Sequence, residues 1–157
     1  MIVKRAYKYR IYPNREQRNF FARTFGCVRL FYNTSLDDMN KLYKEKKEYK
    51  DITPASYKEQ FQFLKEVDSL ALSNAQLNRN KAFKAFFRKQ NKFPKYKTKR
   101  NKQSYSTNNQ NGTVYLSEDC KYISLPKIKN VRIKMHRKFK GVIKTVTVSK
   151  ECDNTYY

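Results

Sequence analysis

The sequence predicts an α+β fold, in which a small antiparallel β-barrel is interrupted by an inserted helical bundle. Short alternating segments lie near both ends of the chain, and apolar residues at three- and four-residue steps lie between them. The chain is 39% hydrophobic and has 13 Tyr and 11 Phe, but only 3 Gly and 4 Pro, so it can bury a core. We expect residues 1–13 and 103–157 to form the barrel, residues 14–92 the inserted helices, and residues 93–102 a basic connecting loop.

The first segment, residues 3–12, is predicted to be a strand with two different faces. Apolar and aromatic residues alternate there with cations, and the cations are Lys4, Lys8 and Arg10. Pro13 ends the strand because proline cannot continue a ladder. A lone strand needs partners for its backbone groups, so we expect it to pair with the strands near the C-terminus.

Two helices are predicted next. Asn14 and Gln17 form a capping-box pattern, which starts a helix over residues 15–25 that Gly26 then ends. A second helix covers roughly residues 28–46 and has an apolar stripe. Two helices joined by a tight glycine turn suggest a helix-turn-helix, and a plain helical hairpin is an equal alternative.

Two further helices complete the inserted bundle. Thr53-Pro54 is a typical helix start and predicts a third helix through Leu64. Asp68 or Ser69 caps a fourth helix that runs to about Lys89.

Beyond Phe93-Pro94 the apolar stripe disappears and short alternating segments follow. We expect strands at residues 114–116, 122–125, 131–135 and 142–148, separated by turns at Asn111-Gly112, Glu118-Asp119, Pro126 and Gly141. Strands at this spacing are typical of a small barrel or sandwich.

The charge of the chain indicates a polyanionic partner. Lys and Arg number 36 against 13 Asp and Glu, which gives a formal net charge of +23. Self-repulsion of this size opposes folding, and nucleic acid would neutralise it with release of counterions. A membrane surface fits less well, because the chain has no long apolar run and no lipidation signal.

Just over half of the excess charge lies in two short segments. Residues 1–13 hold 4 basic and no acidic residues, and residues 88–102 hold 8 basic and none acidic. A run of alternating cations and aromatics can follow a phosphate backbone and stack on bases, although charge runs are commonly solvated linkers. We expect the nucleic-acid-binding residues to be Lys4, Lys8, Arg10, Arg88, Lys95, Tyr96, Lys97, Lys99, Arg100 and Lys102.

The polar run Ser104–Asn111 has two interpretations. Its amide side chains are able to read base edges, and they are equally good turn formers before Gly112. From the residues alone we favour the turn.

The residues predict no catalytic site, no metal site and no cofactor. Cys27, Cys120 and Cys152 are scattered and lack metal-ligand spacing. His136 has no positioned carboxylate partner in the sequence pattern, and no set of acidic residues resembles a two-metal nuclease centre.

The sequence resembles the TnpB/OrfB family of transposon-associated RNA-guided nucleases, which are related to the type V CRISPR effectors. The matching segments occur in family order along nearly the whole chain. They are residues 4–13 (KRAYKYRIYP), 25–29 with Tyr32-Asn33, 64–72 (LKEVDSLAL), 82–88 (AFKAFFR), 93–97 (FPKYK), Ser104-Tyr105 and 125–127 (LPK).

This resemblance implies a wedge-type barrel interrupted by a helical recognition lobe. It implies that the chain binds a guide RNA and double-stranded target DNA in the bacterial cytoplasm, associated with the nucleoid, and not a membrane. The residues that match those reading the target-adjacent motif are Ser69, Ser73, Thr107 and Asn108. In the family a nuclease domain and a zinc ribbon follow this region, so we expect a separate or missing nuclease half.

The function that we expect is therefore that of the non-catalytic, nucleic-acid-binding N-terminal portion of a TnpB-like endonuclease. Two alternatives stay open at this point. One is a stand-alone DNA-binding regulator derived from a nuclease-dead protein, and the other is a truncated transposase without function.

Overall fold

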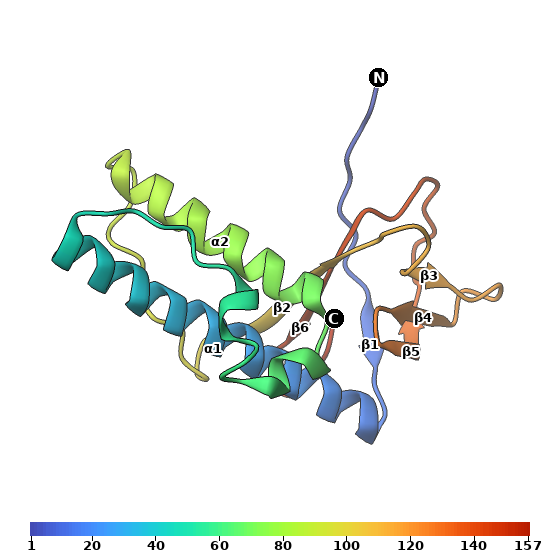
Figure 1. Cartoon of the computed structure of the whole chain (residues 1–157). Coiled ribbons are helices and arrows are strands. Elements are labelled where there is room, and N and C mark those ends of the chain that lie inside the picture. Colours follow the sequence, from blue (N-terminus) through green and yellow to red (C-terminus); the bar gives the residue numbers. More distant parts are fainter.

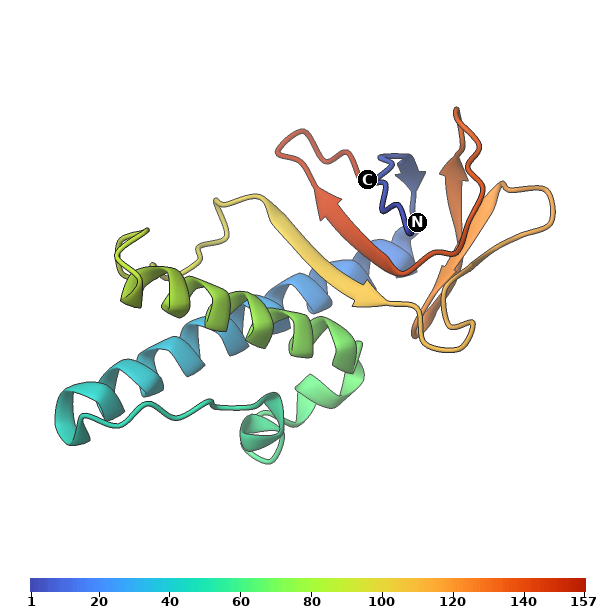
Figure 2. The same ribbon diagram turned by 90° about the horizontal axis from the view of Figure 1, so that it is seen from above.

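The computed structural model describes residues 1–157 (Figure 1). In chain order the elements are β1 (Arg10–Tyr12), α1 (Arg15–Lys46), two short 3₁₀ turns η1 (Pro54–Tyr57) and η2 (Gln62–Glu66), α2 (Ser69–Phe87), β2 (Gln103–Asn108), β3 (Tyr115–Leu116), β4 (Tyr122–Leu125), β5 (Ile128–Lys134) and β6 (Thr145–Lys150). The two helices extend as a hairpin away from the strands, as the view from above shows (Figure 2). This arrangement confirms the α+β class.

The strands form two antiparallel sheets, which are joined near the C-terminus. One sheet has the order β1-β5-β4-β3 and the other pairs β2 with β6. Tyr156 forms a bridge to Ile11 of β1 and another to Lys150 of β6, so the last residues of the chain lie between the sheets. The expected pairing of the N-terminal strand with later strands is confirmed for β1, whereas a closed barrel stays a prediction.

The strand predicted over residues 3–12 is wrong before Arg10. β5 ends at Lys134, which is the partner of Arg10. Residues before Arg10 therefore have no neighbouring strand for their backbone groups, and a strand cannot persist without one. In Figure 1 this stretch runs away from the strands.

The turn predicted at Gly26 is also wrong, because α1 runs through it without a break from Arg15 to Lys46. The capping box of Asn14 and Gln17 is confirmed, with both bonds 2.9 Å long. The helix ends where Lys47 takes a left-handed conformation, with φ of 55°.

Burial on both sides of Gly26 explains the continuous helix. The first half of α1 buries Phe20, Phe21 and Phe25 in the core that it shares with the sheets. The ring centroids of Phe21 and Tyr105 are 6.2 Å apart in this core. The second half buries Tyr32, Leu36 and Met39 against Phe83 of α2. Continuous packing along both halves outweighs the cost of one helical glycine, which is about 1 kcal/mol.

The predicted third helix is present only as the two 3₁₀ turns. Thr53 and Pro54 do start η1, but the Thr53 side chain makes no cap hydrogen bond. Tyr57 and Leu64 are the residues that this segment buries, one in each turn. The fourth helix is confirmed as α2, and its cap is Asp68, whose carboxylate accepts the Leu70 N–H at 2.9 Å.

A fully buried arginine holds the segment after α1 against α2. Arg79 donates to Asp51 Oδ1 at 2.5 Å and to the Ile52 carbonyl at 2.8 Å. Its guanidinium also lies 5.6 Å from the centre of the Phe31 ring. Burial lowers the pKa of Arg79, and Asp51 is the main group that opposes this shift.

The turn favoured for Ser104–Asn111 is wrong over most of its length, because Gln103–Asn108 form β2. Tyr105 and Thr107 point inward and are buried, and β6 supplies the ladder partner for every residue of the strand. The strands β3, β4, β5 and β6 match the predicted segments within about three residues. Gly112 and Gly141 take positive φ angles of 85° and 126°, as turn glycines do.

Gly26→Ala tests the unbroken helix. A Cβ at this position would meet no atom within 4 Å, and the backbone is not left-handed. Alanine should therefore raise the free energy of unfolding by about 0.5–1 kcal/mol, because it loses less backbone entropy in a helix. Urea denaturation measures this change. A loss of stability would indicate a strained glycine turn instead.

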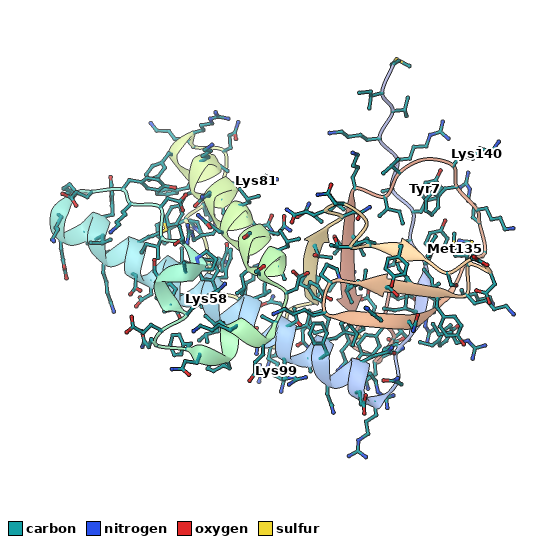
Figure 3. The ribbon with its side chains drawn as sticks, turned by 45° about the vertical axis from the view of Figure 1, so that its right-hand side comes forward. Tyr7, Lys58, Lys81, Lys99, Met135 and Lys140 are labelled. Atoms are coloured by element: carbon teal, nitrogen blue, oxygen red, sulfur yellow. The ribbon has the colours of Figure 1, made fainter.

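Arg79→Met tests the clamp between α2 and the segment that follows α1. Loss of the carbonyl and carboxylate bonds should lower the free energy of unfolding by about 2–3 kcal/mol. Lys81→Met is the matched control, since Lys81 lies on the same helix and its side chain is exposed to solvent (Figure 3). The control should change stability by less than about 0.5 kcal/mol. Equal effects of the two variants would contradict the clamp.

Candidate nucleic-acid interface

Residues 88–102, which we name the basic segment, connect α2 to β2. Arg88 is the C-terminal cap of α2, and its N–H donates to the Lys84 carbonyl at 3.0 Å. No helix or strand forms between Gln90 and Lys102. The segment is nevertheless held in place by contacts with α1.

The centre of the basic segment is anchored to α1 by two adjacent residues. Asn33 accepts the Lys97 N–H and donates to the Lys97 carbonyl, both at 2.7 Å. The Tyr96 hydroxyl donates to Asp37 at 2.9 Å. The Lys97 ammonium lies 4.5 Å from the centre of the Tyr32 ring, and the loss of water around it lowers the pKa of Lys97. Tyr96 and Lys97 are thus partly engaged within the protein.

On the far side of this anchor a tight turn displays two cations. Asn101 Oδ1 accepts the Thr98 N–H at 2.8 Å and the Thr98 hydroxyl at 3.0 Å. This turn carries Lys99 and Arg100 at its apex, and both side chains are exposed. Lys95, on the near side of the anchor, is exposed as well.

A single carboxylate joins the basic segment to the N-terminal residues. Glu151 Oε1 lies 2.7 Å from Lys102 Nζ and 3.8 Å from Lys8 Nζ. Lys8 also lies 4.2 Å above the ring of Tyr157. The two cationic groups identified separately in the sequence therefore meet at the end of β6. Lys4 is exposed further out, and Arg10 lies in β1.

A third cationic stretch, residues 134–140 (KMHRKFK), begins at the end of β5 and was not among the predicted nucleic-acid-binding residues. Only His136 of this stretch was considered from the sequence, as a catalytic candidate. The sequence carries a signal for it, because the stretch contains four cations and no acidic residue, with Met135 and Phe139 among them.

Aromatic contacts hold the N-terminal residues against this third stretch. Tyr7 stacks on Phe139 with ring centroids 5.3 Å apart, and Tyr9 packs on His136 at 5.3 Å. The Tyr9 hydroxyl donates to the Arg137 carbonyl. In Figure 3 Tyr7 and Lys140 lie on the same side of the molecule. The contacts thus form a continuous series from the basic segment through Glu151 and Lys8 to residues 134–140.

The four residues that the resemblance predicts to read the target-adjacent motif lie where α2 begins against β2. Ser69 and Ser73 are exposed on the first turns of α2, and the Ser73 hydroxyl donates to the Ser69 carbonyl at 3.2 Å. Asn108 is half-buried, and its Oδ1 accepts from Asn74 Nδ2 at 2.7 Å. Thr107 is fully buried, and its hydroxyl donates to Asp68. The structure therefore brings the four together, with Thr107 facing inward.

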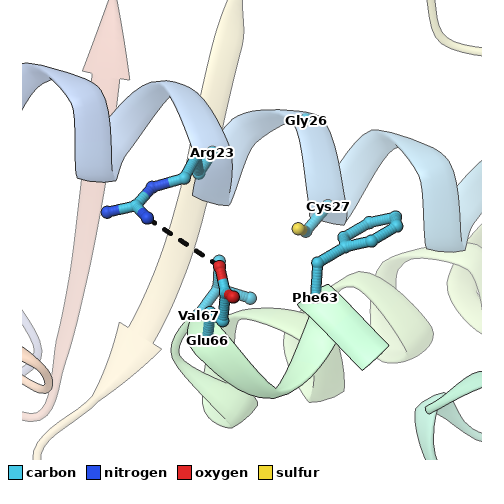
Figure 4. Close-up of a pocket in the computed structure, with 6 residues that line it drawn as sticks. All are labelled: Arg23, Gly26, Cys27, Phe63, Glu66 and Val67. Atoms are coloured by element: carbon cyan, nitrogen blue, oxygen red, sulfur yellow. Dashed lines mark ion pairs between the residues drawn. The ribbon is translucent and has the colours of Figure 1, made fainter. Parts of the chain in front are cut away.

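The acidic, histidine and cysteine side chains are scattered over the structure. No three His, Cys, Asp or Glu side chains come close enough together to hold a metal ion. A cavity of about 280 Å³ lies between α1 and η2 and is lined by Arg23, Gly26, Cys27, Phe63, Glu66 and Val67 (Figure 4). Burial raises the pKa of the Cys27 thiol, so it stays protonated at neutral pH.

Neither helix has an apolar stretch suited to crossing a membrane.

Five of the 36 lysines and arginines lie within 4.0 Å of a carboxylate. The remaining positive charge is therefore not neutralised within the chain. Aromatic side chains lie between many of these cations, which gives the surface the composition of a polyanion-binding surface.

Comparison with known proteins identifies the family. A helix-turn-helix domain family of the IS605 OrfB type matches residues 1–48. A protein of Streptomyces pristinaespiralis named "Putative RNA-guided DNA endonuclease" is 40% identical over 105 residues, which cover 62% of this chain and 26% of that protein. The "Putative RNA-guided DNA endonuclease InsQ" of Escherichia coli (strain K12) is 30% identical over 158 residues, covering 96% of this chain and 39% of that protein.

The chain belongs to the TnpB/OrfB family, in agreement with the resemblance of its motifs. Its matches span 26% and 39% of the lengths of these two curated relatives. The part of the chain matched by the helix-turn-helix family contains one continuous helix, α1, from Arg15 to Lys46.

Asn33→Ala tests the anchoring of the basic segment. Loss of both bonds to Lys97 should increase the hydrogen-exchange rate of the Lys97 amide about tenfold or more, because two hydrogen bonds no longer oppose local opening. Asn19→Ala, at an exposed position on α1, should leave this rate unchanged. An unchanged Lys97 rate in the Asn33 variant would show that the segment is held elsewhere.

Proposed function

We propose that the chain is the nucleic-acid-binding N-terminal portion of a TnpB-like RNA-guided DNA endonuclease, and that it binds a guide RNA and double-stranded target DNA. The unpaired charge carries the proposal: the net charge is +23, and few of the cations have a carboxylate partner. The names of the two relatives support RNA guidance and DNA as the target.

The connected cationic segments are the proposed backbone-binding surface. Lys4, Lys8 and Arg10 supply charge from the N-terminal residues. The basic segment adds Arg88, Lys95, Tyr96, Lys97, Lys99, Arg100 and Lys102. Its anchor on α1 supports this role, because an ordered segment loses less conformational entropy when it binds than a free one does.

At the start of α2 we propose a division of roles among the four residues that match motif-reading positions. Ser69, Ser73 and Asn108 are accessible to a duplex, and their hydroxyl and amide groups can bond to base edges or phosphates. Thr107 is buried against Asp68, so its role is to hold β2 on α2.

We place DNA cleavage outside this chain, in a separate or missing nuclease half. Phosphodiester cleavage of this kind needs converging carboxylates that hold metal ions, and the carboxylates here do not gather in one place. The chain would then contribute binding and orientation.

The salt dependence of binding tests the role of the basic segment. In a Lys99→Gln/Arg100→Gln variant, the slope of log K against log salt concentration should fall by about 1.4–1.8, since each phosphate contact contributes about 0.7–0.9. Fluorescence anisotropy with a labelled RNA and with a labelled DNA duplex measures the slope at several salt concentrations.

Lys58→Gln/Lys81→Gln is the matched control, because it removes the same charge from α2 and from the segment that connects α1 to it (Figure 3). The control should keep the slope of the unaltered chain. Equal loss in both variants would mean that the total charge acts and the basic segment has no special role. Tight duplex binding with no affinity for RNA would favour the stand-alone DNA regulator.

A further inference from the structure

The outer face of the sheet β1-β5-β4 carries a row of large polar side chains. Tyr12 of β1 and Tyr122 of β4 both stand directly opposite Arg132 of β5 in the strand register. Arg10 stands opposite Lys134 one step along. Side chains two residues apart on a strand share a face, so all five belong to the same surface.

The opposite face of the same strands forms the core, which fixes this row toward solvent. Ile11, Ile123, Val131 and Ile133 alternate with the residues of the row, and all four are buried. Tyr12 is 45% exposed and Tyr122 is 42% exposed, and Arg132 is exposed between them. A shift of register by one residue would bury these charges, so the core maintains the row.

A hollow of about 500 Å³ lies beside this row. Three members of the row, Tyr12, Arg132 and Lys134, line it together with Lys121 and Ile133. Two guanidinium groups lie near the Tyr12 ring, that of Arg10 at 5.2 Å and that of Arg132 at 6.0 Å from its centre.

None of the cations around the hollow has a carboxylate within 4.0 Å. Arg10 Nε is also buried without a hydrogen-bond partner. The positive charge of this face is thus left for a ligand.

The combination of exposed rings and unpaired cations selects among anionic ligands. A free phosphate would use the cations but not the tyrosine rings. In a duplex the bases are paired and stacked on one another, so their faces cannot reach these rings. An unpaired strand offers both a phosphate backbone and free base faces, and proteins bind such strands with aromatic side chains beside cations.

We propose that the outer face of β1-β5-β4 binds unpaired nucleotides of a single-stranded nucleic acid. Tyr12 and Tyr122 stack on bases, while Lys121, Arg132 and Lys134 contact the phosphates. This inference rests on the proposed function and adds to it a surface outside the residues assigned above, apart from Arg10 and Lys134.

Tryptophan fluorescence tests the stacking directly, because the chain has no tryptophan. A Tyr12→Trp variant should lose most of its emission when a short oligouridylate is added. Tyr43→Trp is the matched control, since Tyr43 is also 45% exposed but lies near the end of α1. Its emission should change little. Equal quenching in both variants, or no quenching in the Tyr12→Trp variant, would overturn the proposal.

Affinity measurements give a second test that does not depend on the fluorophore. Tyr12→Ala and Tyr122→Ala should each weaken binding of oligouridylate about tenfold, while Tyr12→Phe keeps the stacking surface and should change it less than about twofold. Binding of a blunt DNA duplex should stay within about twofold in all three variants. Oligodeoxyuridylate in place of oligouridylate then tells whether RNA or any single strand is the ligand.

The two proposals fail in different ways. A chain that binds neither oligonucleotide nor duplex would contradict the proposed function and this site together. A chain that binds oligouridylate equally well with and without Tyr12 and Tyr122 would overturn this site alone and leave the proposed function standing.

Discussion

The burial of one long helix, α1, is the constraint on which the rest of the structure depends. Its first half packs Phe20, Phe21 and Phe25 under the sheets, and its second half packs Leu36 and Met39 against α2. At 1.5 Å per residue, its 32 residues span about 48 Å. The same rigid element therefore supports the sheets and the hairpin, and its Asn33 and Asp37 position the basic segment.

Strand pairing then gathers positive charge from distant parts of the chain. Pairing of β1 with β5 places Arg10 beside Lys134, and Tyr156 brings the end of β6 next to β1. Glu151 lies between Lys8 and Lys102 and reduces the repulsion where the N-terminal residues meet the basic segment. Such a surface is costly for the free protein and favourable beside a polyanion, which fits the proposed role.

Local signals in the sequence predicted the features that neighbouring residues decide. The capping box at Asn14 and the cap at Asp68 are examples, and so are the α+β class and most strands. Tertiary packing explains where the sequence-based predictions were wrong. Gly26 lies within a helix because the residues on both sides of it are buried, and the run from Ser104 is a strand because β6 pairs with it. The row of Tyr12, Arg132 and Tyr122 depends on the register between β1 and β5, which lie more than 100 residues apart, and local patterns cannot reveal it.

The cationic segments gathered by the sheets are proposed to bind nucleic acid. Ultraviolet crosslinking of the 157-residue chain to a single-stranded RNA, followed by mass spectrometry of the crosslinked peptides, tests this binding most directly. Crosslinks are expected within residues 4–12, 88–102 and 121–140. Crosslinks concentrated in residues 43–50 at the end of the helical hairpin, or none above background at moderate salt, would contradict it.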